Sequence, residues 1–354
     1  MTGFHDAITY GYSNTRVKAM ESKLVAKETI ERMLSAKETE SIGAMMLQTS
    51  YRGYVEEFGG TRAMDKLIDF ALSKSLGKET NKLVDVAPNA NRAIVRDIVG
   101  VWDMSNIKFM VGALGTGKGF DDISRYLIDS KYVSAARVRE AMAAGSVEGA
   151  IAKLSAVTPY KQELRAALAA YRKSKDVAEV DSAIDVAYYA KLGSTIEKLR
   201  KINAESAGLI SRRIDLKNAL TLLNAKRHGA EFSAVRGYLV SNGSVSIGSL
   251  GKAFGSSKGV DALALGIGAF DLKQAAAEYS AGNGRSLMVF EIAMMNELFR
   301  DALKAVRHSV LSFGTIIAFL YLKEIEVSTL RIIIKGKGYG LADDEIRRMI
   351  TWFK

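Results

Sequence analysis

The sequence predicts an all-α protein, and three observations carry that prediction. Only two prolines, Pro88 and Pro159, occur in 354 residues, so helices can run long without interruption. Hydrophobic residues make up 48% of the chain, which is typical of a globular protein with a sizeable core. Apolar residues also recur at every fourth position over 287–306, from Phe290 to Val306, which is the spacing of one broad helical face.

Other segments give the elements on either side. We expect a helix over 16–38, because one side of its helical wheel is apolar and contains Val17, Met20, Leu24, Ile30 and Leu34. Glycine-rich tracts at 242–258 and 281–284 interrupt the pattern and predict loops. The longest apolar run, 309–322, has 14 residues, whereas a membrane-spanning helix needs about 20. We therefore expect a buried core helix there.

One segment is repeated along the chain. Residues 102–117, 213–229 and 324–340 align, each with an acidic residue close to its start and a glycine at its end. The aligned columns are Asp103, Asp215 and Glu326; Gly117, Gly229 and Gly340; Ile123, Val235 and Ile346; and Leu127, Leu239 and Ile350. A fainter copy opens the chain, where Ser13 and Asn14 match Ser105 and Asn106. The spacing is too long for a solenoid repeat and predicts small domains with their own cores.

A second segment repeats at 66–76, 183–192 and 289–298, with Asp69, Asp185 and Glu291 in one column. Because each acid lies inside an apolar helix, we expect it to cap or pair within its own bundle. Together the repeats predict three helical units at 1–100, 101–213 and 214–354. The third unit ends in a partial copy of the segment that opens the chain.

No pattern for catalysis or cofactor binding emerges. Residues 112–118 satisfy the first seven positions of a phosphate-binding loop, but Gly119 stands where the magnesium-binding hydroxyl is required, so we interpret the stretch as a helix end. The glycine cluster of 332–340 lacks dinucleotide-loop spacing. The chain has no cysteine, and its three histidines lack metal-ligand spacing. We expect no catalytic, cofactor or metal site, and the absence of a signal peptide at the start indicates a cytoplasmic setting.

The charge of the chain points to acidic partners. The formal net charge is +11 and the pI is near 9.5. Residues 1–100 carry 14 basic and 13 acidic residues, whereas 101–213 and 214–354 each carry 18 and 13, so the excess lies in the later two units. Such an excess favours association with acidic surfaces.

A family resemblance is carried by two segments, YLKEIEVSTLRIIIKGKGYGLADDEIRRMI (321–350) and YGYSNTRVKAMESKLVAKETIERMLSAKE (10–38). In a chain of this length they resemble the C subunit of the archaeal-type (V/A-type) rotary ATP synthase, which is related to the d subunit of the vacuolar proton pump. The resemblance implies a funnel of three similar helical-bundle domains around a pseudo-threefold axis. It implies a non-catalytic adaptor that seats the central shaft on the membrane ion-carrying ring and transmits torque, without a small-molecule substrate.

The partners implied are therefore the central stalk subunits and the rotor ring. The chain would be peripheral, on the cytoplasmic side of the cell membrane, and would contact the membrane only through the ring. Basic residues cluster at corresponding repeat turns, and we expect them to contact these partners: Arg212, Arg213, Lys226, Arg227, Lys335 and Lys337. The alternative is a basic α-helical repeat scaffold that binds nucleic acid or acidic proteins.

Overall fold

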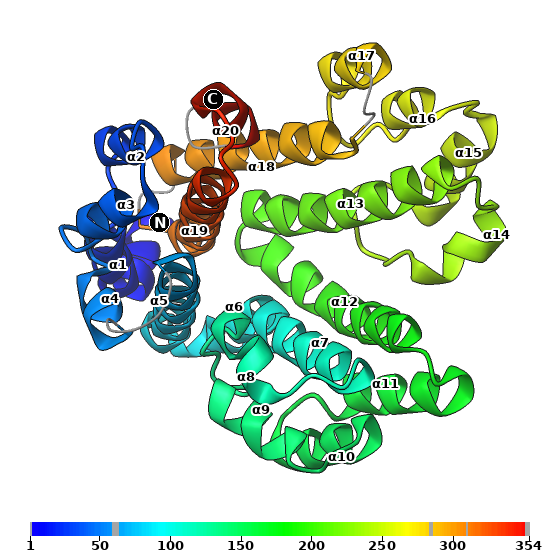
Figure 1. Cartoon of the computed structure of the whole chain (residues 1–354), viewed down its shortest axis with the longest axis horizontal. Helices are drawn as coiled ribbons and strands as arrows, with labels where there is room; N and C mark the ends of the chain where they lie inside the picture. The colour runs from blue at the N-terminus through cyan, green and yellow to red at the C-terminus, as the bar shows by residue number, and fades with distance from the viewer. Residues whose placement is uncertain (1, 59–63, 283–285, 309–310, 351–354) are drawn as a thin grey trace. The chain divides into compact units, whose positions relative to one another are not determined.

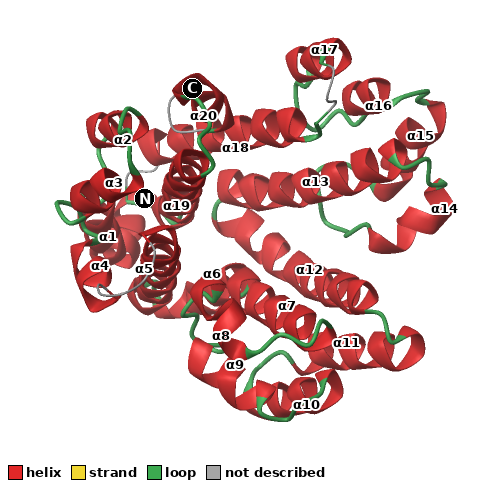
Figure 2. Ribbon diagram, viewed as in Figure 1, coloured by secondary structure: helices red, strands yellow, loops and turns green. Residues whose placement is uncertain are grey.

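The computed structural model describes residues 2–58, 64–282, 286–308 and 311–350 (Figure 1). Helices and turns account for these residues, with no strand among them (Figure 2), so the all-α prediction is confirmed. The chain divides into two compact units. Unit 1 contains Met1–Ile184 and Val310–Lys354, and unit 2 contains Asp185–Ser309. The predicted three-unit division and the funnel stay predictions.

Unit 1 is built from both ends of the chain. Its N-terminal helices are α1 (Thr2–Glu21), α2 (Lys27–Leu34), α3 (Thr39–Met46), α4 (Arg52–Phe58), α5 (Met64–Val86) and α6 (Arg92–Val99). They are followed by α7 (Val101–Gly115), α8 (Phe120–Ile123), α9 (Ala135–Met142), α10 (Val147–Val157) and α11 (Lys161–Ser174). The unit also contains α19 (Gly314–Gly338) and α20 (Asp343–Met349) from the end of the chain. The division from unit 2 falls within α12 (Val177–Ile202).

The core of unit 1 forms around α19, which packs against α5 and α1 (Figure 1). The apolar run at 309–322 is helical from Gly314 onward, and every side chain from Thr315 to Lys323 is buried, so the predicted buried helix is confirmed over that part. Residues 311–313 form a turn before it, and Leu311 is exposed. Ile333 and Ile334, further along α19, join a cluster with residues of α2, α3 and α5 such as Met33 and Leu72. Each fully buried side chain of this kind stabilises the fold by about 1.5 to 3 kcal/mol.

Unit 2 has its own core between α13 (Ala204–Arg227) and α18 (Met288–His308). Phe290, Met294 and Leu298 of α18 are buried against Leu222 and Leu223 of α13, which confirms the helix predicted over 287–306. The unit also contains most of α12, the short 3-10 helix η3 (Arg236–Tyr238), and the shorter helices α14 (Phe232–Val235), α15 (Ile247–Ser256), α16 (Val260–Gly266) and α17 (Lys273–Ala281).

The helix expected over 16–38 is confirmed only in part, because the chain forms two helices there and breaks between them at 22–26. Helix α1 ends at Glu21 and α2 begins at Lys27, with Ala26 in an extended conformation (φ −63°, ψ 147°). The backbone N–H of Val25 donates to the carboxylate of Glu326 at 2.6 Å, a bond that an uninterrupted helix could not make. A tertiary contact therefore overrides the local helical pattern.

The expected loop over 242–258 is also wrong in part, because α15 lies inside it. Ser246 caps this helix, since its Oγ accepts from the Ser249 N–H at 3.1 Å, and Leu250 is buried on one face. A Cβ at Gly251 would lie 2.8 Å from a ring carbon of Phe232, so this glycine allows close packing of the helix. Of the second glycine tract, residues 283 and 284 lie outside the described residues.

Candidate functional site

The three repeated helices, α7, α13 and α19, end in the same way. Gly117, Gly229 and Gly340 follow them with φ of 70°, 69° and 72°, a left-handed conformation that favours glycine. After each glycine, a backbone N–H reaches back to the carbonyl five residues earlier: Lys118 to Ala113 (2.8 Å), Ala230 to Ala225 (3.0 Å) and Leu341 to Gly336 (2.9 Å). This is the Schellman motif, so residues 112–118 form a helix end and not a phosphate-binding loop.

The aligned apolar columns beyond the glycines are buried in all three copies. The buried residues are Ile123, Val235 and Ile346, followed by Leu127, Leu239 and Ile350. Each copy thus has a long helix, a glycine turn and a short segment folded back onto the core. The sequence alignment of these segments therefore corresponds to one recurring local structure.

The aligned acids Asp103, Asp215 and Glu326 each hold their copy of the repeat together through hydrogen bonds. In every case the buried carboxylate accepts the backbone N–H of a valine that precedes a short helix. The pairs are Asp103 with Val133 (2.7 Å), Asp215 with Val245 (3.1 Å) and Glu326 with Val25 (2.6 Å). We call each pair, with its other donors, a carboxylate clamp, because it joins a long helix to the start of α9, α15 or α2.

Hydroxyl groups complete two of the clamps with the same residue type. Tyr160 donates to Asp103 at 2.6 Å, and Tyr51 donates to Glu326 at 2.9 Å. Burial raises the pKa of Asp103, although bonds from Ser130, Tyr160 and the backbone favour its charged form. Burial also raises the pKa of Tyr51 well above its usual range, with a further contribution from the charge of Glu326. The Tyr51 hydroxyl therefore stays protonated and acts as a donor.

The Asp215 clamp uses a single serine in place of a tyrosine. Its carboxylate accepts from both the backbone N–H (2.9 Å) and the hydroxyl (2.5 Å) of Ser244. The donors to this carboxylate come from one loop and are neutral. The clamp thus keeps its geometry while its chemistry varies.

A side-chain amide supports the first two clamps. Asn106 exchanges hydrogen bonds with the backbone of Ile128, and Asn218 does the same with Val240, each partner being 22 residues later. Asn14, matched to Asn106 in the sequence, instead bonds the backbone of Ser312. The third copy has Thr329 at the aligned position. Sequence comparison found the acids and glycines but missed the amide's role.

The residue three positions before each clamp acid differs in all three copies. It is Gly100, Arg212 and Lys323 in turn. A Cβ at Gly100 would lie 2.8 Å from the hydroxyl of Tyr160, so glycine makes room there. Lys323 is only 2% exposed and donates to Glu326 at 2.6 Å and to the hydroxyl of Tyr51 at 2.9 Å. The third clamp is thus a buried ion pair.

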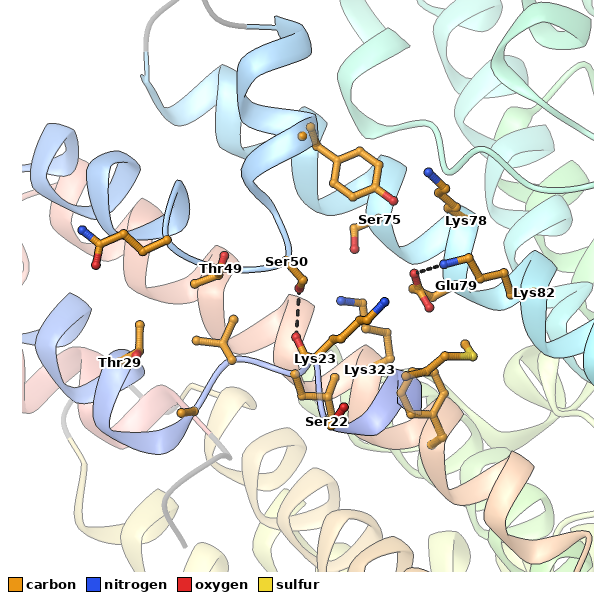
Figure 3. A pocket seen from close by; sticks show the side chains of 18 of the residues that line it. Ser22, Lys23, Thr29, Thr49, Ser50, Ser75, Lys78, Glu79, Lys82 and Lys323 are labelled. Carbon is orange, nitrogen blue, oxygen red and sulfur yellow. Dashed lines mark hydrogen bonds and ion pairs between the residues drawn. The ribbon is translucent and has the colours of Figure 1, made fainter. Parts of the chain in front are cut away.

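A pocket of about 760 Å³ opens beside the Glu326 clamp (Figure 3). Its walls come from the loop between α1 and α2, from α4 and the turn before it, and from the helices α5 and α19. Four lysines line it: Lys23, Lys78, Lys82 and Lys323. Figure 3 shows Lys78, Glu79 and Lys82 rising from α5, with Lys23 on the loop and Lys323 on α19.

The charges in this pocket are only partly balanced. Lys82 pairs with Glu79 at 2.8 Å, while the ammonium of Lys78 lies 5.5 Å from the ring centroid of Tyr54. Burial, with smaller contributions from Glu79 and Glu57, raises the pKa of Tyr54 to about 12. Glu57 and Glu79 are the two carboxylates among the lining residues, and Glu326 pairs with Lys323 behind the pocket wall, so four lysines face three carboxylates.

The predicted column of Asp69, Asp185 and Glu291 has two buried members. Asp69 accepts from Arg331 at 2.9 Å and lies 3.6 Å from the ammonium of Lys335, both on α19. Asp185 pairs with Lys217. Glu291 is exposed and lines a second pocket in unit 2. A common structural role for the column stays a prediction.

The six predicted contact residues differ in their surroundings. Arg212 bonds Glu297 and Asp301; Lys226 donates to the carbonyl of Phe254 (3.0 Å); Lys335 pairs with Asp69; and Lys337 pairs with Asp343 (2.5 Å). Arg213 is partly buried, and Arg227 is exposed and donates to Asn224 at 3.3 Å. Internal bonds therefore engage most of these side chains.

Within the described ranges, no group of three or more histidine or acidic side chains is arranged to hold a metal ion. Over the same ranges, every helix is too short or too polar to cross a membrane. The chemistry of the described residues is that of internal clamps and a lysine-lined pocket.

Comparison with known proteins identifies the family. The family model described as ATP synthase (C/AC39) subunit matches residues 13–349. The chain is 26% identical over 342 residues to the C subunit of the A-type ATP synthase of Haloquadratum walsbyi, covering 95% of this chain and 96% of that protein. It is 27% identical over 345 residues to the C subunit of the V-type ATP synthase of Deinococcus radiodurans, covering 96% and 91%.

A third relative extends the match to nearly the whole chain. The C subunit of the A-type ATP synthase of Methanocaldococcus jannaschii is 24% identical over 356 residues, covering 98% of this chain and 87% of that protein. These matches confirm the predicted resemblance, and they do not favour the nucleic-acid-binding alternative. The chain belongs to the ATP synthase (C/AC39) subunit family.

Proposed function

We propose that this chain is a non-catalytic coupling subunit of a V/A-type rotary ATP synthase. In this role it seats the central shaft on the ion-carrying membrane ring and transmits torque between them. The observation that carries the proposal is the set of three carboxylate clamps in a chain whose relatives are named as C subunits of ATP synthases over nearly their whole length.

The clamps support a mechanical role because they resist relative movement of neighbouring helices. Each one ties a long helix to a short helix through two or more hydrogen bonds, which are buried in the Asp103 and Glu326 clamps and partly buried in the Asp215 clamp. Buried bonds of this kind are costly to break, and tightly packed interiors deform little under load. The ionisable groups of the clamps are committed to these bonds, which supports a structural role for them.

The proposed setting is peripheral, on the cytoplasmic face of the cell membrane, with the membrane reached through the ring. Partner binding would use exposed basic side chains of the predicted set, and Arg227 fits this role best because it is exposed at the end of α13. Lys335, with 43% of its side chain exposed, comes next. The other four residues of the predicted set would mainly stabilise the conformation of the partner-binding surfaces; they are Arg212, Arg213, Lys226 and Lys337.

The test compares the purified rotary complex with and without this chain. We expect the complex lacking the chain to keep ATP hydrolysis and to lose ATP-driven ion transport into vesicles, and we expect the added chain to restore transport. Equal ion transport without the chain would overturn the proposal. So would ATP hydrolysis by the chain alone.

The contact residues are tested separately by charge reversal. We expect Arg227→Glu to weaken recovery of the chain with the shaft and ring subunits, because rim charges steer association. Lys37→Glu is the matched control, since Lys37 is an exposed lysine outside the predicted set. Equal recovery of both variants would remove Arg227 from the proposed interface.

A further inference from the structure

We propose that the pocket beside the Glu326 clamp binds a small molecule that carries more than one phosphate group. This inference goes beyond the coupling role and does not depend on it. It rests on the charge, shape and floor of the pocket, all of which lie within unit 1.

The walls of the pocket carry uncompensated positive charge. Among the described residues, no carboxylate lies within ion-pair distance of Lys23 or Lys78, whereas Lys82 has Glu79. Lys78 and Lys82 are one turn apart on α5, and like charges at this spacing disfavour each other unless an anion lies between them. A bound anion would remove that repulsion.

The floor of the pocket adds a buried ammonium group. Lys323 lines the pocket although it is only 2% exposed. Its two hydrogen bonds, to Glu326 and Tyr51, use two of the three N–H donors of an ammonium group. The third donor can serve a ligand in the pocket. A buried donor of this kind is pre-positioned, because its side chain is already fixed by two partners.

The other two copies of the repeat lack this arrangement at the aligned position. Gly100 has no side chain there, and Arg212 is taken up by Glu297 and Asp301. Lys323 is not needed to form a clamp, because Asp103 forms one with hydroxyl and backbone donors alone. The lysine thus supplies something that the clamp itself does not require.

The size and chemistry of the pocket favour a polyphosphate ligand. Lysine acts as a compact point charge and is a common phosphate binder. A volume of about 760 Å³ falls in the range of small-molecule sites and far exceeds a single phosphate ion. Ammonium groups on both the loop and α5 suit a di- or triphosphate that reaches both walls. The half-buried ring of Tyr54 offers apolar surface for a nucleoside.

The experiment is calorimetric titration of the full chain at low salt with sodium tripolyphosphate and, separately, with ATP, both without magnesium. We expect the double variant Lys23→Ala, Lys78→Ala to raise the Kd about tenfold or more, which corresponds to losing two favourable charges. We expect Glu79→Gln to lower the Kd several-fold, because it removes a repelling carboxylate and releases Lys82.

The matched control is Lys37→Ala, which removes one exposed lysine of unit 1 outside the pocket. We expect it to change the Kd less than twofold, and circular dichroism checks that every variant is folded. Absence of binding by both anions at about 1 mM would overturn the proposal. Equal weakening by Lys37→Ala and the pocket variants would also overturn it. If ATP binds more tightly than tripolyphosphate, the ligand is a nucleotide; equal affinity indicates recognition of the phosphates alone.

Discussion

Asp103 and Glu326 hold equivalent positions in unit 1 but are stabilised by different chemistry. Both accept a valine N–H and a tyrosine hydroxyl. The third donor to Asp103 is the neutral hydroxyl of Ser130 at 2.6 Å, whereas the third donor to Glu326 is the ammonium of Lys323. One clamp is a buried acid among neutral donors, and the other is a buried ion pair.

The repeat therefore preserves a geometry and not a fixed set of hydrogen-bond donors. The fold requires a carboxylate acceptor on the long helix, which holds the residue that precedes the N-cap of a short helix. Neutral or charged donors can satisfy that acceptor, but they differ in what remains when the acceptor is removed. Loss of Asp103 leaves neutral donors unpaired, and loss of the Glu326 charge leaves a buried cation.

The largest expected effect comes from Glu326→Gln. The variant leaves the ammonium of Lys323 buried without a counter-charge, which lowers the free energy of unfolding by about 3 to 5 kcal/mol. Urea unfolding at neutral pH measures the loss. The control is Lys323→Met with Glu326→Gln, which removes the cation as well and should recover a large part of the stability. If Glu326→Gln lowers the free energy of unfolding no more than Asp103→Asn does, the proposed contrast between the two clamps is wrong.

A smaller effect is expected for Asp103→Asn, about 1 to 3 kcal/mol, because the unpaired donors are neutral. Its pH dependence is distinctive. Burial raises the pKa of Asp103 in the folded state, so its stabilising contribution is full below the unfolded pKa of about 3.9 and is lost as the pH rises through the raised value. The advantage of the natural protein over Asp103→Asn should therefore shrink with rising pH. Unfolding midpoints measured across this range test the sign, and a growing advantage would contradict it.

The glycine turns should respond alike in all three copies. Alanine at Gly117, Gly229 or Gly340 must adopt a left-handed conformation, which costs about 1 to 2 kcal/mol. We expect the three thermal-unfolding losses to agree closely, in contrast to the clamps. Gly338→Ala is the control, since a Cβ there meets nothing within 4 Å and the residue is helical. Widely different losses would show that the turns are not equivalent.

The smallest effect is expected at the surface pair that joins α20 to α2. Arg347 donates to both oxygens of Glu31, at 3.1 and 2.8 Å, and chiefly this bonding lowers the pKa of Glu31. Arg347→Gln should cost at most about 1 kcal/mol, because exposed pairs are screened by water and salt. The contribution is present above the unfolded pKa of about 4.3 and is lost as the pH falls, the opposite sign to Asp103. A loss that persists at low pH would point to packing instead.

Local patterns in the sequence predicted part of this picture. The helix end predicted at residues 112–118 was confirmed, and the aligned Gly229 and Gly340 end their helices in the same way, because few residue types tolerate a left-handed turn. The pattern around Val25 failed, since its bond to Glu326 spans 301 residues and leaves no local trace. The family resemblance was confirmed over residues 13–349.

The candidate site was harder to predict, because its contacts join residues that lie far apart in the sequence. Clusters such as Arg212 and Arg213 showed where charge is concentrated but not that Glu297 and Asp301 bind Arg212. The pocket depends on side chains from four separate elements, including Lys23 and Lys323, which are 300 residues apart in the chain. Periodicity reports which face of a helix is buried, and it does not report what lies opposite that face.

The composition of unit 1 from both ends of the chain has a consequence for biosynthesis. Residues 1–184 emerge from the ribosome long before α19 is made. While unit 2 is being translated, the N–H of Val25 lacks its acceptor Glu326, and α1 and α5 lack the helix against which they pack. Unit 2 is contiguous and can fold as soon as it emerges. We expect a chain that stops before Gly314 to be recognised by chaperones as unfinished. Only a completely translated chain can then close its own core and join an assembly.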